Sequence, residues 1–175
     1  DYQRHDSIGW NQRLPEIAAA VALAELERID ELTALRTYAA NAFAAVVQDC
    51  EWLVPQKTPE GYVNAYWTYA ARITRDDIVW ADFLAAFKAL GGDGFYGPPY
   101  PAHLEPVFAK LNADVDTNPD RHPHFAGKLP RYERGNCPVW EEIQPRVIML
   151  KTNYFDTAEP DRQAEIFAQT IERFN

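Results

Sequence analysis

Cysteines are scarce in this sequence, and long hydrophobic runs are absent. The two cysteines, Cys50 and Cys137, are too few for a disulfide scaffold and too separate for a zinc site. No run of 18 or more apolar residues occurs, so we expect no membrane-spanning helix. The N-terminus shows no signal-peptide pattern. Together these absences predict a protein of the reducing cytoplasm.

Positively charged residues are also fewer than negatively charged ones. The chain has 17 Lys and Arg against 26 Asp and Glu, which gives a formal net charge of −9. This balance disfavours non-specific binding to nucleic acid and to anionic membrane surfaces. A hydrophobic fraction of 47% and an aromatic fraction of 13% are instead typical of a globular protein. At 175 residues, the chain can form one domain or one domain with extensions.

Residues 9–16 predict a polar turn that leads into a helix. Gly9 accepts backbone conformations that other residues resist, and Pro15 suits the first helical position. Glu16 places a negative charge at the positive end of the helix dipole. Apolar residues then recur every three or four positions with no Gly or Pro between them. The pattern predicts a single helix from about Pro15 to Gln48.

The middle of the chain predicts a strand followed by a helix. Residues 65–73 are rich in aromatics, which favours a β-strand. Residues 74–77 resemble a capping box with Asp in place of Glu. The helix that follows should end at Gly91-Gly92. Its expected inward residues are Ile78, Phe83, Leu84, Phe87 and Leu90.

The second half of the chain combines irregular segments with short structured ones. Prolines and glycines predict an irregular segment at 94–106 and a long surface loop at 118–135. Residues 138–144 predict a short helix, and 146–150 a short buried strand. Thr157 is expected to cap a last helix. Its expected inward residues are Ala164, Phe167, Ile171 and Phe174.

Three segments resemble blocks of the DegT/DnrJ/EryC1/StrS family. Residues 9–30 resemble its G-[YWF]-N-x-R-…-A-A-…-L-x-x-[IL]-[DE] block. Residues 101–108, Pro-Ala-His-Leu-Glu-Pro-Val-Phe, resemble its P-L-H-x-Q-P-x-F segment. Residues 137–150 resemble its [LC]-P-x-A-E segment and the strand after it. One departure is Glu105, which stands where the family has glutamine, so local substrate contacts can differ.

The resemblance implies an α/β fold, namely the C-terminal part of a fold-type I transferase that depends on pyridoxal 5'-phosphate. This part has a long bridging helix and a small antiparallel or mixed sheet with helices. Residues 1–48 would then form the end of the large domain and the bridging helix, and residues 49–175 the small domain. The chain starts at Asp1 and not at Met, which fits a fragment or a processed protein, and the resemblance implies that roughly the first half of the enzyme is missing.

The resemblance also implies a function in amino transfer. An amino acid, glutamate in the family, would give its amino group to pyridoxal phosphate, and the amine would pass to a keto sugar carried on a nucleotide. The enzyme would be a homodimer with shared active sites. Three alternatives remain: a dehydratase of the same fold, in which histidine replaces the cofactor lysine; a non-catalytic regulatory protein; and an unrelated α+β binding module.

Three residues are candidates for the site. By resemblance, Asn11 would donate its amide hydrogen to the cofactor phosphate of the neighbouring subunit, although an asparagine also suits a simple turn. Arg13 has a guanidinium suited to phosphate or carboxylate in the substrate, but could instead pair with Glu16. His103 would contact the substrate, or serve only its own loop.

The catalytic lysine is expected outside this chain. In the family, a lysine that binds the cofactor as a Schiff base precedes the first block by some tens of residues. All lysines here follow that block: Lys57, Lys88, Lys110, Lys128 and Lys151. We therefore expect no catalytic residue in this chain and no activity from it alone. A metal site at His122 and His124 is not expected, because no ligand pattern accompanies them.

Overall fold

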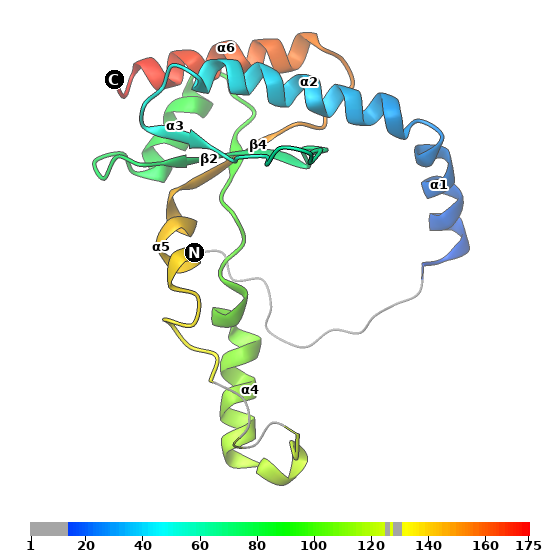
Figure 1. Cartoon of the computed structure of the whole chain (residues 1–175), viewed down its shortest axis with the longest axis vertical. Coiled ribbons are helices and arrows are strands. Elements are labelled where there is room, and N and C mark those ends of the chain that lie inside the picture. The colour runs from blue at the N-terminus through cyan, green and yellow to red at the C-terminus, as the bar shows by residue number, and fades with distance from the viewer. Residues whose placement is uncertain (1–13, 125–126, 128–130) are drawn as a thin grey trace. The chain divides into compact units, whose positions relative to one another are not determined.

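The computed structural model describes residues 14–124, 127 and 131–175. The described residues group into two compact units. The first, here called the sandwich unit, comprises residues 14–97 and 146–175; the second, the loop-and-helix unit, comprises residues 98–145. The elements of the chain are shown in Figure 1. In order they are α1 (Glu16–Leu26), α2 (Ile29–Val47), β1 (Leu53–Pro55), β2 (Thr68–Ile73), α3 (Trp80–Ala89), β3 (Phe95–Tyr96), the 3-10 turn η1 (Ala102–Leu104), α4 (Pro106–Thr117), the 3-10 turn η2 (Pro119–Arg121), α5 (Pro138–Ile143), the 3-10 turn η3 (Gln144–Arg146), β4 (Val147–Lys151) and α6 (Ala158–Glu172).

The sandwich unit contains a small antiparallel sheet, as the resemblance predicted. Its four strands lie in the order β1-β2-β4-β3, and every neighbouring pair is antiparallel. Tyr69 pairs with Leu150 and Ala71 with Ile148, so these four side chains share one face. All four are buried. The alternation of buried and half-buried residues along β2 and β4 is that of a sheet covered by helices on this face.

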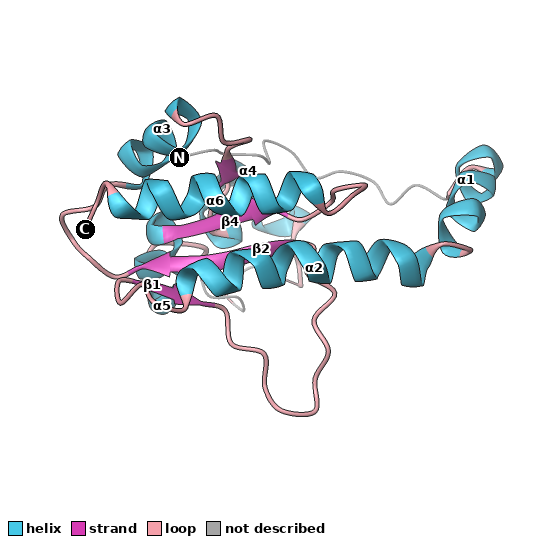
Figure 2. Ribbon diagram, turned by 90° about the horizontal axis from the view of Figure 1, so that it is seen from above, coloured by secondary structure: helices cyan, strands magenta, loops and turns pink. Residues whose placement is uncertain are grey.

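Helices α2 and α6 lie side by side over the buried face of the sheet (Figures 1 and 2). They run in the same direction (Figure 1), and Tyr38 in the middle of α2 donates its hydroxyl to the carboxylate of Asp161 near the start of α6. Aromatic rings fill the space between helices and sheet. The ring of Phe167 packs against Phe43, Phe83 and Phe87 at centroid distances of 6.1 Å. These contacts belong to one apolar core.

The predicted single helix from Pro15 to Gln48 is interrupted in the structure. It divides into α1 and α2 at Glu27 and Arg28, although neither glycine nor proline lies there. The break separates two different patterns. The apolar residues of α1 lie around its whole circumference and none is buried, whereas those of α2 lie on one face and pack on the core. Tertiary packing holds α2, and nothing in the sandwich unit extends that packing to α1.

The start of α3 also differs from the prediction. Thr74 does not cap it; its hydroxyl donates to the carbonyl of Trp52, and Asp77 accepts the guanidinium of Arg75. The helix begins at Trp80, three residues beyond the predicted capping box, without a side-chain cap. Its end agrees with the prediction. Gly91 has a φ of 91°, and the N–H of Gly92 donates to the carbonyl of Phe87, as in a glycine-ended helix.

The final helix and its inward-facing residues are confirmed. Ala164, Phe167 and Ile171 of α6 are buried, and Phe174 packs partly against the core. Thr157 does precede α6, but its side chain makes no capping bond; the carboxylate of Asp156 accepts the N–H of Glu159 instead. Among the described residues, no helix is both long and apolar enough to cross a membrane.

Candidate functional site

His103 and Glu141 form the centre of the candidate site in the loop-and-helix unit. Nε2 of His103, in η1, lies 2.6 Å from Oε1 of Glu141, in α5. Both side chains are largely buried, with 11% and 7% exposure. With a carboxylate as acceptor, Nε2 carries the proton, so Nδ1 of a neutral ring is a hydrogen-bond acceptor. Two of the family-like segments, 101–108 and 137–150, therefore meet through one bond.

Backbone N–H groups fix the carboxylate of Glu141. The N–H of Gly135 donates to both oxygens at 2.9 Å, and the N–H of Cys137 donates to Oε1 at 3.2 Å. Burial on its own raises the pKa of Glu141, but the bonds from Gly135, His103 and Cys137 outweigh it. The pKa of Glu141 therefore lies below its ordinary value. A carboxylate held charged in this way fixes the orientation of the His103 ring.

Segment 131–136, which supplies Gly135, is anchored on α4. Asn112 donates its amide to the carbonyl of Tyr132 at 2.8 Å and accepts the N–H of Tyr132 at 3.2 Å. The rings of Phe108 and Tyr132 lie 4.5 Å apart between centroids. Arg131 pairs with Asp116 at 2.6 Å. Helix α4 was not predicted, and with these contacts it positions the backbone that holds Glu141.

A second histidine of this unit also pairs with a carboxylate. Nε2 of His122 lies 2.6 Å from Oδ2 of Asp114, which Asn118 also contacts. His122 and Asn118 lower the pKa of Asp114, chiefly through these hydrogen bonds. Across the described part of the chain, no group of three or more His, Cys, Asp or Glu side chains could hold a metal ion. The pairing of His122 is therefore with a helix carboxylate.

Of the three site residues predicted from the sequence, one lies in the part of the chain that the structure describes. Asn11 and Arg13 lie outside the described residues, so their proposed roles stay predictions. His103 is described, and its contact is with Glu141; the sequence did not predict this pairing. One feature of the sequence could have indicated the pairing: His103 and Glu141 both lie in family-like segments. Glu105, which replaces the family glutamine, is buried, with 1% exposure.

The cavity in the sandwich unit does not fit pyridoxal phosphate. A cavity of about 670 Å³ lies between α2, β1 and β2, but no lysine, arginine or histidine lines it. Lys151 is already engaged, with Nζ 3.4 Å from Asp93 and 4.6 Å from the centre of the Tyr154 ring. A phosphate ester needs cationic or N–H donors, and the cofactor needs an accessible lysine. We therefore derive no catalytic step through this cofactor from these residues.

Comparison with known proteins extends the resemblance. Residues 1–134 match the DegT/DnrJ/EryC1/StrS aminotransferase family. The chain is 28% identical over 147 residues to a pleiotropic regulatory protein of Geobacillus stearothermophilus, covering 80% of this chain and 36% of that protein. It is also 28% identical over 119 residues to L-glutamine:2-deoxy-scyllo-inosose aminotransferase of Streptomyces kanamyceticus, covering 68% of this chain and 26% of that protein.

Solved structures show the same fold. The sugar aminotransferase CalS13 from Micromonospora echinospora gives a TM-score of 0.63 at 16% identity, covering 90% of this chain and 35% of that one. E. coli GDP-4-keto-6-deoxy-D-mannose-3-dehydratase, solved with bound hydrated pyridoxal phosphate, gives 0.59 at 15% identity, covering 91% and 36%. This chain thus spans about a third of each structure. Its fold is that of pyridoxal phosphate-dependent sugar aminotransferases, and the chain belongs to the DegT/DnrJ/EryC1/StrS aminotransferase family.

Proposed function

We propose that this chain is the C-terminal part of an enzyme that transfers an amino group, from glutamate, to a keto sugar linked to a nucleotide. Residues 1–48 would connect to a large domain, and residues 49–175 would form the small domain. The observation that carries the proposal is the family match over residues 1–134. It is supported by the bond between His103 and Glu141, which joins the second family-like segment to the third.

His103 has a definite role in this proposal. Its Nε2 is committed to Glu141, and Nδ1 makes no hydrogen bond within the described part of the chain. In the neutral ring Nδ1 accepts a hydrogen bond, and a sugar hydroxyl is a suitable donor. Glu141 would then act as a positioning residue, because its fixed carboxylate sets both the tautomer and the ring orientation of His103.

The cofactor would be held mainly by residues beyond this chain. Pyridoxal phosphate would carry the amino group, while protein residues bind and orient it. Asn11 would donate its amide to the phosphate across a dimer interface, and Arg13 would bind the substrate. An aminotransferase and its dehydratase relatives differ at the residue that anchors the cofactor. That residue is a lysine in the one and a histidine in the other, and it precedes Gly9 in the family.

Helix α1 supports the proposal of a larger assembly. Ile17, Val21, Leu23 and Leu26 are 84%, 61%, 60% and 59% exposed. Exposed apolar patches of this kind favour association. We propose that the large domain and the partner subunit cover α1. The chain by itself should then self-associate, which sedimentation velocity would detect; a monomer stable to dilution would contradict this.

Two other functions remain candidates, and one observation favours each. A dehydratase is favoured by the structural likeness to the E. coli 3-dehydratase. A non-catalytic regulator is favoured by the 80% coverage of this chain in the match to the pleiotropic regulatory protein. Incubating the complete enzyme with glutamate, pyridoxal phosphate and a nucleotide-linked keto sugar separates the three. An aminated sugar supports the proposal, a deoxygenated keto sugar supports the dehydratase, and no turnover supports the regulator.

The role of Asn11 has its own test in the complete enzyme. Asn11→Ala removes one hydrogen bond to a charged phosphate, which contributes about 1.5–3 kcal/mol. Cofactor affinity should therefore fall roughly ten- to a hundredfold, as measured by equilibrium titration of absorbance. Leu84→Ala is the control: it loosens the edge of the core in α3 and should lower stability but not cofactor affinity. Unchanged affinity in Asn11→Ala would leave Asn11 as a turn residue.

A further inference from the structure

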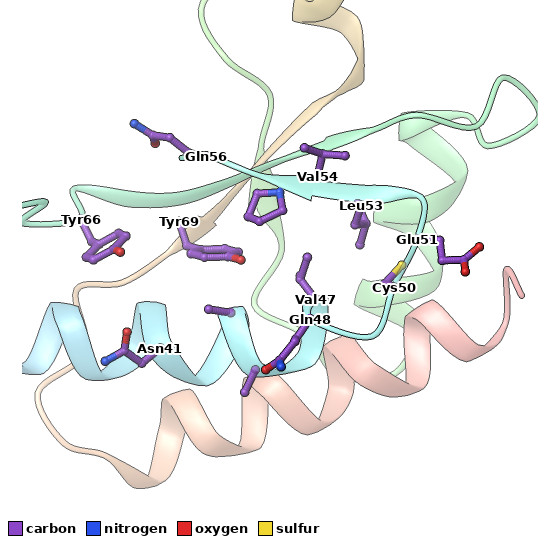
Figure 3. A pocket seen from close by; sticks show the side chains of 13 residues that line it. Asn41, Val47, Gln48, Cys50, Glu51, Leu53, Val54, Gln56, Tyr66 and Tyr69 are labelled. Carbon is purple, nitrogen blue, oxygen red and sulfur yellow. The ribbon is translucent and has the colours of Figure 1, made fainter. Parts of the chain in front are cut away.

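The residues just before β2 interrupt the alternation of the strand. Tyr69, Ala71 and Ile73 of β2 are buried on the face that α2 covers. One more step of this alternation toward the N-terminus would place Trp67 on the same face and Tyr66 on the opposite one. The structure shows the reverse: Trp67 is 75% exposed, whereas Tyr66 packs partly against the core. Figure 3 shows the ring of Tyr66 next to that of Tyr69, between the strand and α2, so the two side chains have exchanged sides.

The backbone of Tyr66 produces this exchange. Its φ is 48°, in the left-handed region that bulky residues rarely occupy. One residue in that conformation at the end of a strand bends the chain, as in a β-bulge, and turns the neighbouring side chain to the other face. The sequence favours an extended conformation here, because residues 65–73 are rich in aromatics. The observed conformation is therefore strained and depends on contacts with other parts of the chain.

Three side chains make these contacts. Asn64 accepts the N–H of Tyr66 at 2.8 Å. The hydroxyl of Thr152, which is fully buried, lies 2.6 Å from the carbonyl oxygen of Tyr66 and 3.1 Å from that of Trp67. Arg36 of α2 donates to the hydroxyl of Thr152 and to the carbonyl of Trp67, both at 3.3 Å. Of the three, Arg36 lies on a helix, so it links the strained segment to the position of α2.

We propose that residues 64–67 form a two-position switch that responds to α2. In the observed position the Tyr66 ring lies beside the cavity between α2, β1 and β2, and Trp67 lies on the surface. In the second position Tyr66 takes an extended conformation, β2 begins earlier, and Trp67 enters the cavity in place of Tyr66. A shift of α2 away from the sheet breaks the bonds of Arg36 and favours the second position. The switch thus converts a movement of α2 into the removal of an exposed indole ring from the surface.

The second position fits the register of the sheet and the space beside it. Thr68 pairs with Lys151 at the start of β2. One further step in this antiparallel register pairs Trp67 with Thr152, so the ladder continues without a shift. Trp67 then faces α2, where alanine side chains of the helix line a cavity of about 670 Å³. The inference uses only the sandwich unit and does not depend on the proposed function.

A pair of substitutions at Tyr66 tests the two positions in the 175-residue chain. Both Tyr66→Gly and Tyr66→Val remove the phenol ring, so their comparison isolates the backbone. Glycine accepts a positive φ and should keep the observed position, whereas the β-branched valine resists it and should favour the second. With 5-fluorotryptophan incorporated, the fluorine signal of Trp67, assigned by Trp67→Phe, should show the solvent isotope shift of an exposed ring in Tyr66→Gly and of a buried ring in Tyr66→Val. An exposed Trp67 ring in both variants would overturn the proposal.

Substitutions of the contacts test the control by α2. Thr152→Val removes the hydroxyl, and Thr152→Ser, which keeps it, is the matched control. Arg36→Met removes both bonds of the guanidinium, and Arg28→Met, in an exposed ion pair with Glu31, is its control. Each lost hydrogen bond should shift the ratio of the two positions about two- to tenfold toward the second. The Cα and Cβ chemical shifts of Tyr66 report this ratio, because they differ between left-handed and extended backbone.

The two contact variants separate the switch from its control. Circular dichroism first establishes that each variant is folded; if Thr152→Val is not, Arg36→Met carries the test, because Arg36 is only half-buried. Unchanged Tyr66 shifts in every folded contact variant would overturn the switch. Changed shifts in Thr152→Val with unchanged shifts in Arg36→Met would overturn its control by α2.

Discussion

The two units of the molecule are stabilised by different interactions. Every buried side chain of the apolar core lies in the sandwich unit, where rings such as Phe83 and Phe167 are fully enclosed. The loop-and-helix unit contributes nothing to that core in its described part. Its described contacts include hydrogen bonds from His103, Asn112 and His122, together with the ring pair of Phe108 and Tyr132. The apolar core is thus confined to the sandwich unit, whereas the hydrogen bonds that position His103 and Glu141 lie in the loop-and-helix unit.

This difference separates stability from positioning. Apolar burial has no direction, so it holds the sandwich together without orienting any one group. Hydrogen bonds fix orientation, and those to carboxylates respond to pH. The polar residues His103 and Glu141, from two of the family-like segments, lie in the loop-and-helix unit. We therefore expect substitutions in the core of the sandwich unit to change global stability, and substitutions in the loop-and-helix unit to change local geometry.

The largest expected effect is in the apolar core. Phe83 is fully buried, with rings of Trp52, Phe95, Phe167 and Phe174 within 6.1 Å between centroids. Phe83→Ala should lower the free energy of unfolding by about 3–5 kcal/mol, measured by urea denaturation followed by circular dichroism. Phe155→Ala, at an 86% exposed position, is the control and should change little. Equal effects of the two variants would mean that the core is not centred on Phe83.

A smaller, local effect is expected at Glu141. Glu141→Gln removes the negative charge of the carboxylate that contacts His103 and accepts hydrogen bonds from the N–H groups of Gly135 and Cys137. Amide hydrogens of residues 135 and 137 should then exchange roughly three- to tenfold faster, while those of β2 and β4 stay protected. Glu142→Gln is a matched control, since Glu142 is the exposed neighbour. Faster exchange throughout the sheet would show that the two units do not respond separately.

The pH dependence of the same carboxylate sharpens the comparison. The folded-state pKa of Glu141 is depressed below 4.5, so its stabilising contribution is present above pH 4.5 and is lost as the pH falls through the lower folded value. Carboxyl-carbon NMR should therefore give a midpoint for Glu141 below 4.5. His103→Ala should raise that midpoint.

The control for this titration is the other histidine–carboxylate pair. His122→Ala removes a bond of the same length, 2.6 Å, but to Asp114. It should raise the midpoint of Asp114 and leave that of Glu141 unchanged. If both variants shift Glu141 equally, the effect is a general loss of structure in residues 98–145 and not the loss of one bond.

Sequence patterns predicted the apolar parts of the fold well. The inward residues of α6 and the glycine end of α3 follow from periodicity and from the conformational freedom of Gly91. The predicted strand 65–73 begins three residues late, at Thr68, because Tyr66 takes a left-handed conformation held by Thr152. That contact joins positions 86 residues apart and leaves no local signal.

The loop-and-helix unit was harder to predict from the sequence. Helix α4 starts with Pro106 at its first position, a signal that was available, but its apolar pattern is weak and none of its residues is buried. The pairing of His103 with Glu141 spans 38 residues and depends on a bond that no local pattern encodes. Directional contacts between distant segments arise only once the chain has folded, so sequence spacing identifies the residues but not their partners.

The smallest effect is expected at Lys151, the lysine that ends β4. Its ion pair with Asp93 and its contact with Tyr154 are partly exposed, so Lys151→Met should change the free energy of unfolding by less than about 1 kcal/mol. Lys57→Met in the exposed loop after β1 is the matched control. Both variants should also match the parent in absorbance after incubation with pyridoxal phosphate and dialysis, because neither lysine lines the cavity between α2, β1 and β2, and Lys151 is already engaged by Asp93 and Tyr154. A stoichiometric band in the parent that only Lys151→Met loses would make Lys151 the cofactor lysine and place the chemistry in the sandwich unit.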